Sequence, residues 1–275
     1  MKLPQRNGRW APIAVAAAAV AAVITAPASA QAASVTLPPV GAKWDYQIGQ
    51  AYTPPAGVKI VSRDWKAAPA AGLYNICYIN AFQTQKQGEV PDGIQDWPSD
   101  LKIKGSNGKD AIDPEWKEAI LDITTDAKRQ RIATRIKSHI DDCASKGFNA
   151  LELDNYDSFT RGVVKGKITK AHAEAYVRIL SSYGHSKGLA VAQKNTVELA
   201  SRHALNGLDF AVVEDCGQWT ECGDFVDAFG NNIVVVEYTD GGLATACEYG
   251  DRISVVRRDE NVTAPGSGEY RYGTC

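Results

Sequence analysis

Short apolar runs of strand character recur along the sequence and alternate with segments whose apolar residues repeat every three to four positions. The runs that predict strands are 46–50, 58–65, 74–80, 150–154, 189–195, 210–215, 232–238 and 252–257. The segments that predict helices are 112–122, 126–147, 170–187, 197–204 and 225–229. Such alternation favours an α/β fold with a parallel sheet, and eight strands suggest closure into a single (β/α)₈ barrel of the TIM type.

One part of the chain breaks this pattern. Residues 83–108 are rich in Gly, Asp, Gln and Ser and have no clear periodicity. The segment is too long for an ordinary connection, so we expect it to form a functional loop over one end of the fold.

The first residues have the composition of a secretory signal peptide. Lys2, Arg6 and Arg9 precede an Ala/Val-rich apolar run, and small residues follow at 27–33. We therefore predict a signal peptide and cleavage region at 1–33, a leader at 34–43 and one domain at 44–275. No later apolar run is long enough to span a membrane, which predicts a secreted, extracellular protein with no membrane contact after cleavage.

The net charge of the chain narrows the class of partner. Without the three early cations, the 30 basic residues fall to 27 against 32 acidic ones, a net charge of −5. This balance argues against nucleic acid and suits a positively charged or neutral partner.

The six cysteines of an exported chain favour disulfides, for which fifteen pairings are possible. Cys216 is close enough to Cys222 to close a loop, and Cys247 with Cys275 would fix the tail, leaving Cys77 for Cys143.

Polar residues collect where the predicted strands end. The pairs are Asp154-Asn155, Lys194-Asn195, Glu214-Asp215 and Glu237-Tyr238. In a barrel of parallel strands, these ends meet at one mouth, where active sites form. Alternation along 150–154 also places Glu152 and Asp154 on one face and two leucines on the other.

Two carboxylates at separate strand ends are what glycoside hydrolysis requires, one as acid and the other as nucleophile or base. Asp154 and Glu214 form the predicted pair, and Glu237 is a candidate for either role. Glu152 lies two residues deeper, where an ion pair with Lys194 is the preferred interpretation. The cysteine spacing and the four histidines support neither a metal site nor a Ser-His-Asp triad, so no cofactor and no metal are expected.

In this order, these segments resemble glycoside hydrolase family 114, the endo-α-1,4-polygalactosaminidases. The resemblance runs from about residue 44 to 258 and rests on the strands at 46–48, 76–78, 152–157, 194–195, 210–216 and 236–238. It implies a barrel acting on α-1,4-linked galactosamine polymers, with Asp154 and Glu214 as catalytic acids. The candidate substrate-binding residues are Tyr78, Glu152, Asn155, Asp157, Lys194, Asn195, Asp215, Glu237 and Tyr238.

The sequence thus predicts a secreted, monomeric, endo-acting hydrolase of a cationic amino-sugar polysaccharide. An acidic rim of Asp157, Asp215 and Glu237 would attract such a polycation. Two alternatives remain open: a carbohydrate-binding barrel without catalysis, and a hydrolase of another α-linked glycan.

Overall fold

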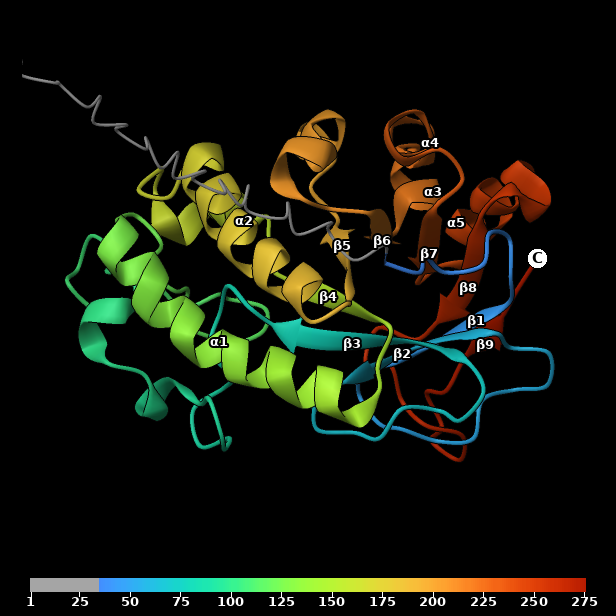
Figure 1. Cartoon of the computed structure of the whole chain (residues 1–275), viewed down its shortest axis with the longest axis horizontal. Coiled ribbons are helices and arrows are strands. Elements are labelled where there is room, and N and C mark those ends of the chain that lie inside the picture. The colour runs from blue at the N-terminus through green and yellow to red at the C-terminus, as the bar shows by residue number, and fades with distance from the viewer. Residues whose placement is uncertain (1–34) are drawn as a thin grey trace, which may run out of the picture. The chain divides into compact units, whose positions relative to one another are not determined.

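The computed structural model describes residues 35–275, so the predicted signal peptide and the first residue of the predicted leader lie outside the described residues. Its centre is a curled sheet in which eight parallel strands follow one another in sequence order (Figure 1). The strands are β1 (Trp44–Gln47), β2 (Ile60–Asp64), β3 (Tyr74–Asn80), β4 (Ala150–Asp154), β5 (Ala190–Lys194), β6 (Phe210–Glu214), β7 (Ile233–Glu237) and β8 (Ser254–Arg258). A short antiparallel strand, β9 (Tyr272–Gly273), extends the sheet beyond β8. The predicted parallel α/β fold is confirmed.

The curled sheet brings its first strand back beside β8. No backbone ladder joins these two strands, which both lie within residues 35–275. Side chains bridge them instead: the Arg258 guanidinium lies 3.1 Å from the Asp45 carboxylate, and both residues are fully buried.

Helices cover the outer face after β3 and after each later strand up to β7. They are α1 (Asp126–Lys146), α2 (Lys170–Ser186), the 3₁₀ segment η5 (Val197–Asn206), α3 (Cys216–Trp219), α4 (Cys222–Phe229), α5 (Asp240–Ala246) and the 3₁₀ segment η6 (Cys247–Arg252). The predicted helix at 126–147 ends where expected, because Gly147 adopts the left-handed conformation that stops a helix. Loops follow β1 and β2, where the regular barrel pattern has helices.

Two apolar layers are separated by the sheet. Inward-facing residues such as Tyr46, Ile76 and Val212 fill the barrel interior. Outward-facing residues such as Leu151 and Val213 pack against the helices. The alternation that the sequence shows along each strand is therefore used on both faces.

The insertion between β3 and α1 differs from the prediction. Residues 112–122 do not form a helix: Ile112 pairs with Ala119, and Ile120 pairs with Gln83 in isolated antiparallel bridges. The carboxylate of Asp113 accepts hydrogen bonds from the next backbone amides and starts a turn. Bridges to neighbouring segments therefore form here in place of the helix that the periodicity predicted. The insertion also contains short 3₁₀ turns at η1 (Ile94–Asp96) and η2 (Ser99–Leu101), and two more, η3 (Ser158–Thr160) and η4 (Gly162–Val164), follow β4.

Three disulfides link Cys77 to Cys143, Cys216 to Cys222 and Cys247 to Cys275. These are the pairs expected from the sequence. Among residues 35–275, no helix combines the length and apolar character that crossing a bilayer requires.

Candidate active site

The ammonium group of Lys194 lies at the centre of the barrel mouth. Its Nζ is 2.9 Å from Glu152, 3.1 Å from Asp154 and 3.3 Å from Glu214. The side chain of Lys194 is only 2% exposed, whereas Asp154 and Glu214 are 17% and 27% exposed. One buried cation therefore joins three carboxylates, of which the upper two are open to a ligand.

Strand periodicity explains this convergence. Glu152 and Asp154 share the inward face of β4, Lys194 ends β5 and Glu214 ends β6. Residues two apart on a strand point to the same side, so Glu152 lies one layer below Asp154. Neighbouring parallel strands bring the three ends to one edge of the sheet, as predicted from the sequence.

Burial and neighbouring charges decide the ionisation of this cluster. Burial opposes the charge on Lys194, yet Asp154, Glu214 and Glu152 together hold its pKa well above the ordinary value. Burial also opposes ionisation of Asp154, but Lys194 and the hydrogen bond from Tyr78 lower its pKa. Burial raises the pKa of Glu152 despite Lys194. The site thus holds a charged lysine beside an ionised Asp154.

Each of the two exposed carboxylates has its own donors. The hydroxyl of Tyr78 donates to Asp154 at 2.7 Å, and that of Tyr238 donates to Glu214 at 2.5 Å. Asn195 holds Glu214 twice, because its amide donates to the carboxylate at 2.9 Å and accepts from the Glu214 backbone N–H at 2.8 Å. These contacts fix the carboxylates in place before any substrate arrives.

Three successive strands end in a residue with left-handed backbone. Asn155, Asn195 and Asp215 have φ angles of 65°, 45° and 55°. Asn and Asp tolerate this conformation better than other residues with a side chain, which explains why they follow the functional residues here. Such backbone geometry gathers at functional sites because it turns the chain sharply after the strand.

The structure places the remaining sequence candidates around this centre in different ways. Asn155 donates to Asn80 at 3.0 Å, and Asp157 pairs with Arg161 at 3.1 Å. Asp215 accepts from the Tyr238 backbone N–H at 3.0 Å. All three contact protein groups, and contact with a substrate stays a prediction for each of them.

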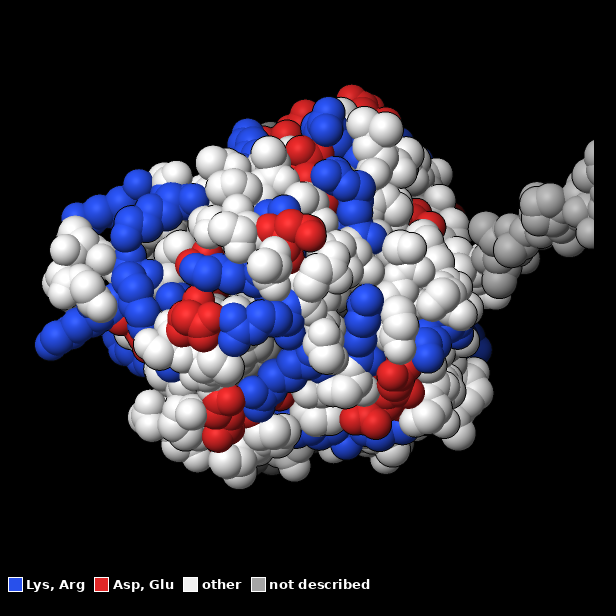
Figure 2. Space-filling model, turned by 60° about the vertical axis from the view of Figure 1, so that its left-hand side comes forward, with Lys and Arg blue, Asp and Glu red and all other residues white. Residues whose placement is uncertain are grey.

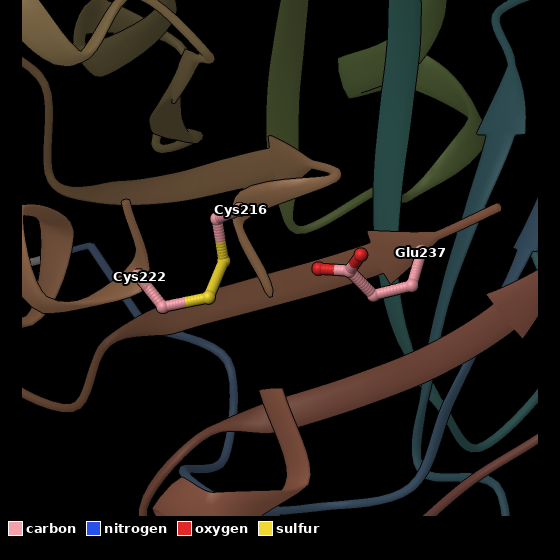
Figure 3. Close-up of side chains that lie close together, drawn as sticks. All are labelled: Cys216, Cys222 and Glu237. Atoms are coloured by element: carbon pink, nitrogen blue, oxygen red, sulfur yellow. A yellow bond between two sulfur atoms is a disulfide. The ribbon is translucent and has the colours of Figure 1, made fainter. Parts of the chain in front are cut away.

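Glu237 does not lie on an exposed rim, contrary to the expectation. It is fully buried on the outer face of β7, and its carboxylate accepts from the backbone N–H groups of Gly217 at 2.6 Å and Gln218 at 3.3 Å. Figure 3 shows the carboxylate extending toward Cys216. The reason is strand parity, by which successive side chains on a strand point to opposite faces. Val236 faces the interior, so Glu237 must face the helices.

Cys216, Cys222 and Glu237 bring three potential metal ligands within 4.8 Å of one another. The two cysteines form a disulfide and offer no thiolate (Figure 3). A metal needs deprotonated thiol ligands, so this group does not qualify as a centre. Glu237 instead binds the start of α3.

Sequence reasoning missed several residues of the site. Tyr46 and Ser62 donate to Glu152 at 2.7 and 2.6 Å from the inward faces of β1 and β2, and strand parity alone could have identified them. Asn80 ends β3 on the same face as Tyr78. Glu118 lies in the irregular insertion, and no pattern in the sequence could have identified it. Only the pairing of distant segments brings its carboxylate to the Asn80 amide, at 2.8 Å.

Surface charge is distributed unevenly. Figure 2 shows a face on which lysine and arginine side chains cover more area than acidic ones. Elsewhere in the described residues, two loops approach each other through lysines: Lys165 lies 3.0 Å from Ser106, and Lys167 donates to the Lys104 carbonyl. The face seen in Figure 2 therefore does not carry the net negative charge of the chain. Attraction of a cationic substrate would depend on the carboxylates near the mouth.

Comparison with solved structures shows the same fold in two proteins of low sequence identity. A crystal structure of Ega3 from Aspergillus fumigatus in complex with galactosamine has a TM-score of 0.69 and 20% identity, covering 88% of this chain and 98% of that chain. The glycoside hydrolase domain of PelA from Pseudomonas aeruginosa has a TM-score of 0.54 and 16% identity, covering 83% and 98%. No curated protein sequence matches the chain.

The family comparison covers nearly the whole sequence. Residues 24–274 match the profile described as glycoside-hydrolase family GH114. The resemblance drawn from the strand-end motifs is thereby confirmed, and the protein is a glycoside hydrolase. The chain belongs to glycoside-hydrolase family GH114.

Proposed function

We propose that this protein is a secreted, endo-acting hydrolase of α-1,4-linked, galactosamine-rich polysaccharide, with Asp154 and Glu214 as its catalytic pair. The observation that carries the proposal is the pair of partly exposed carboxylates on one buried lysine. Membership of the family and a similar structure solved with galactosamine support the substrate class. Three disulfides suit an oxidising, extracellular environment.

We infer a retaining mechanism, with which the spacing of the two carboxylates is compatible. One oxygen of Asp154 and one of Glu214 lie 3.1 and 3.3 Å from the same Nζ, so these oxygens are no further apart than the sum, about 6.4 Å. Retaining enzymes hold their carboxyl groups about 5–5.5 Å apart, and inverting ones about 6.5–9.5 Å. This bound on the two nearest oxygens is compatible with the retaining geometry, in which a carboxylate attacks directly, and the configuration of the first product tests it.

The lowered pKa of Asp154 supports its proposed role as nucleophile, because an ionised carboxylate suits that role. Asp154 attacks the anomeric carbon while Glu214 gives its proton to the leaving oxygen, and the glycosidic C–O bond breaks. Glu214 then takes a proton from water, which attacks the same carbon and releases the Asp154 carboxylate. The Lys194 ammonium stays protonated and offsets the negative charge at each stage.

The test is release of reducing ends from purified α-1,4-galactosamine polymer by the wild type, Asp154→Asn and Glu214→Gln. We expect the wild type to cut the polymer and both variants to fall by several orders of magnitude. Asp142→Asn and Glu248→Gln, which replace exposed acids outside the mouth, should keep full activity. NMR of the first product should show the α-anomer if the configuration is retained.

Other outcomes would point to other functions. A wild type that binds the polymer without cutting it would be a carbohydrate-binding barrel, and the proposal would be wrong. Cleavage of a neutral α-linked glycan in preference to the amino sugar would keep the enzyme but change its substrate. Salt separates these substrates, since affinity for a polycation should fall as ionic strength rises and affinity for a neutral glycan should not.

A further inference from the structure

Glu118 lies in the insertion between β3 and α1, at a position that the backbone holds firmly. The neighbouring Ala119 donates its N–H to the hydroxyl of Thr84 at 3.1 Å and accepts the Thr84 backbone N–H at 2.9 Å. The carbonyl of Glu118 itself accepts from the Asp113 N–H at 2.8 Å. Bonds on both sides fix the direction in which its side chain leaves the backbone.

That side chain reaches the edge of the catalytic centre. One carboxylate oxygen of Glu118 accepts from the Asn80 side-chain amide at 2.8 Å. Asn80 ends β3 directly opposite Asp154 in the parallel register, and its own oxygen accepts from Asn155 at 3.0 Å. A single amide side chain therefore separates Glu118 from the strand that carries the proposed nucleophile.

Glu118 is 8% exposed and has no lysine or arginine within ion-pair distance among residues 35–275. Its second carboxylate oxygen accepts no hydrogen bond from the same part of the chain and is not fully buried, so a ligand group can reach it. Other buried acids are compensated: Glu152 has Lys194, Asp113 has Arg161, and Glu237 has backbone amides. Buried carboxylates without such compensation are rare, because burial penalises their charge.

The charges that face Glu118 come from two segments. Asp154 on β4 and Glu89 in the loop after β3 repel its charge, while Lys86 in that loop attracts it. Burial is the largest cause that raises the pKa of Glu118, and the two acids add to it. The hydrogen bond from Asn80 and the charge of Lys86 lower the pKa, and the net result is a pKa of about 8. A cation placed beside the free oxygen would relieve this energetic cost.

We propose that Glu118 is a specificity-determining residue that receives the ammonium group of an amino sugar bound against Asp154. This inference rests on the proposed function and names the group by which that site selects its substrate. A protonated amine supplies the missing cation and donor. An acetamide or a hydroxyl at the same place supplies no charge, so Glu118 stays protonated and no ion pair forms.

The experiment compares the wild type with Glu118→Gln, which keeps the size of the side chain and an acceptor for Asn80. The matched control is Glu115→Gln, which removes the same charge from an exposed residue of the same loop. Each protein is assayed for kcat and KM on α-1,4-galactosamine polymer and on its fully N-acetylated form. Binding of galactosamine oligomers is measured by calorimetry at pH 7 in buffers of different ionisation enthalpy.

We expect Glu118→Gln to raise KM for the free-amine polymer on the order of 10- to 100-fold and to change KM for the acetylated polymer less than about twofold. Glu115→Gln should behave as the wild type. Because Glu118 is mostly protonated at pH 7 when unliganded, ammonium binding should release roughly one proton from the wild type and almost none from the variant.

Equal losses on both polymers would overturn the inference, since Glu118 would then only support Asp154. No change on either polymer, or equal proton release by both proteins, would overturn it as well. If the wild type binds the oligomers but cuts neither polymer, the proposed function fails, and weaker binding by Glu118→Gln alone would still uphold the inference. If the wild type neither binds nor cuts, both fail.

Discussion

Lys194 is the residue whose removal tests the electrostatic account of the site most directly. Lys194→Met keeps the length and apolar stem of the side chain but removes the only cation that contacts Glu152, Asp154 and Glu214 together within residues 35–275. Three buried or half-buried carboxylates would then face one another without compensation. We expect a less stable protein without activity at neutral pH.

The magnitude follows from the burial of the group. Removing one partner of a buried ion pair typically costs about 3–5 kcal/mol, because the other charge stays buried and unpaired. Here Glu152 is fully buried and would keep only the hydroxyl donors of Tyr46 and Ser62, so this range applies to its lost ion pair. Tyr78, Tyr238 and Asn195 keep donating to the two outer carboxylates, which limits the further loss. We therefore expect about 3–5 kcal/mol at pH 7.

The loss should depend on pH with a defined sign. In the variant, Glu152 and Asp154 lose the cation that lowers their pKa, so folding is penalised once the pH exceeds their unfolded pKa of about 4. In the wild type, Lys194 stays charged and the pKa of Asp154 is lowered, so Asp154 stabilises the fold above its unfolded pKa. The difference between the two proteins should be largest near pH 7 and should shrink toward pH 4.

Urea unfolding followed by circular dichroism at pH 4, 5.5 and 7 measures this difference. Lys187→Met is the control, because Lys187 pairs with Asp141 on the surface and its loss should hardly change stability at any pH. Equal stability of Lys194→Met and the wild type at pH 7, or a loss that stays constant down to pH 4, would refute the electrostatic account.

Two further predictions address the hydrogen bond on the nucleophile and the packing beneath the mouth. Tyr78→Phe removes a donor that helps lower the pKa of Asp154, so the acidic limb of kcat/KM against pH should move to higher pH; an unmoved limb would contradict this role. Gly242→Ala would place a Cβ 2.1 Å from the Glu237 carboxylate and should cost about 1–3 kcal/mol, lowering the melting temperature by several degrees. Gly241→Ala, with nothing within 4 Å, is the control and should melt no lower than the wild type.

Local patterns in the sequence were sufficient for much of the barrel. Alternation along 150–154 gave the faces of Glu152 and Asp154, because side-chain direction on a strand depends only on parity. The helix at 126–147 was equally readable, since its apolar periodicity and Gly147 are local signals. The ion pair of Glu152 with Lys194 followed from placing both residues on inward faces of neighbouring strands.

Other features depended on contacts between distant segments. The sequence suggested a helix at 112–122, but pairing with Gln83 and its neighbours is stronger than the weak helical preference of that segment. Glu237 was assigned to the rim although parity turns it toward α3, where the amides of Gly217 and Gln218 bind it. Helices α3 and α5 were not anticipated, because such short helices have little periodicity and rely on packing.

The sequence by itself determined which residues could converge, since parallel strands in sequence order bring their last residues to one edge of the sheet. Only the tertiary structure decided that Lys194 touches three carboxylates at once, and that Glu118 reaches the mouth from an irregular insertion. The physical reason is that strand parity is a property of neighbouring residues, whereas the position of an insertion depends on hydrogen bonds to segments far away in the chain.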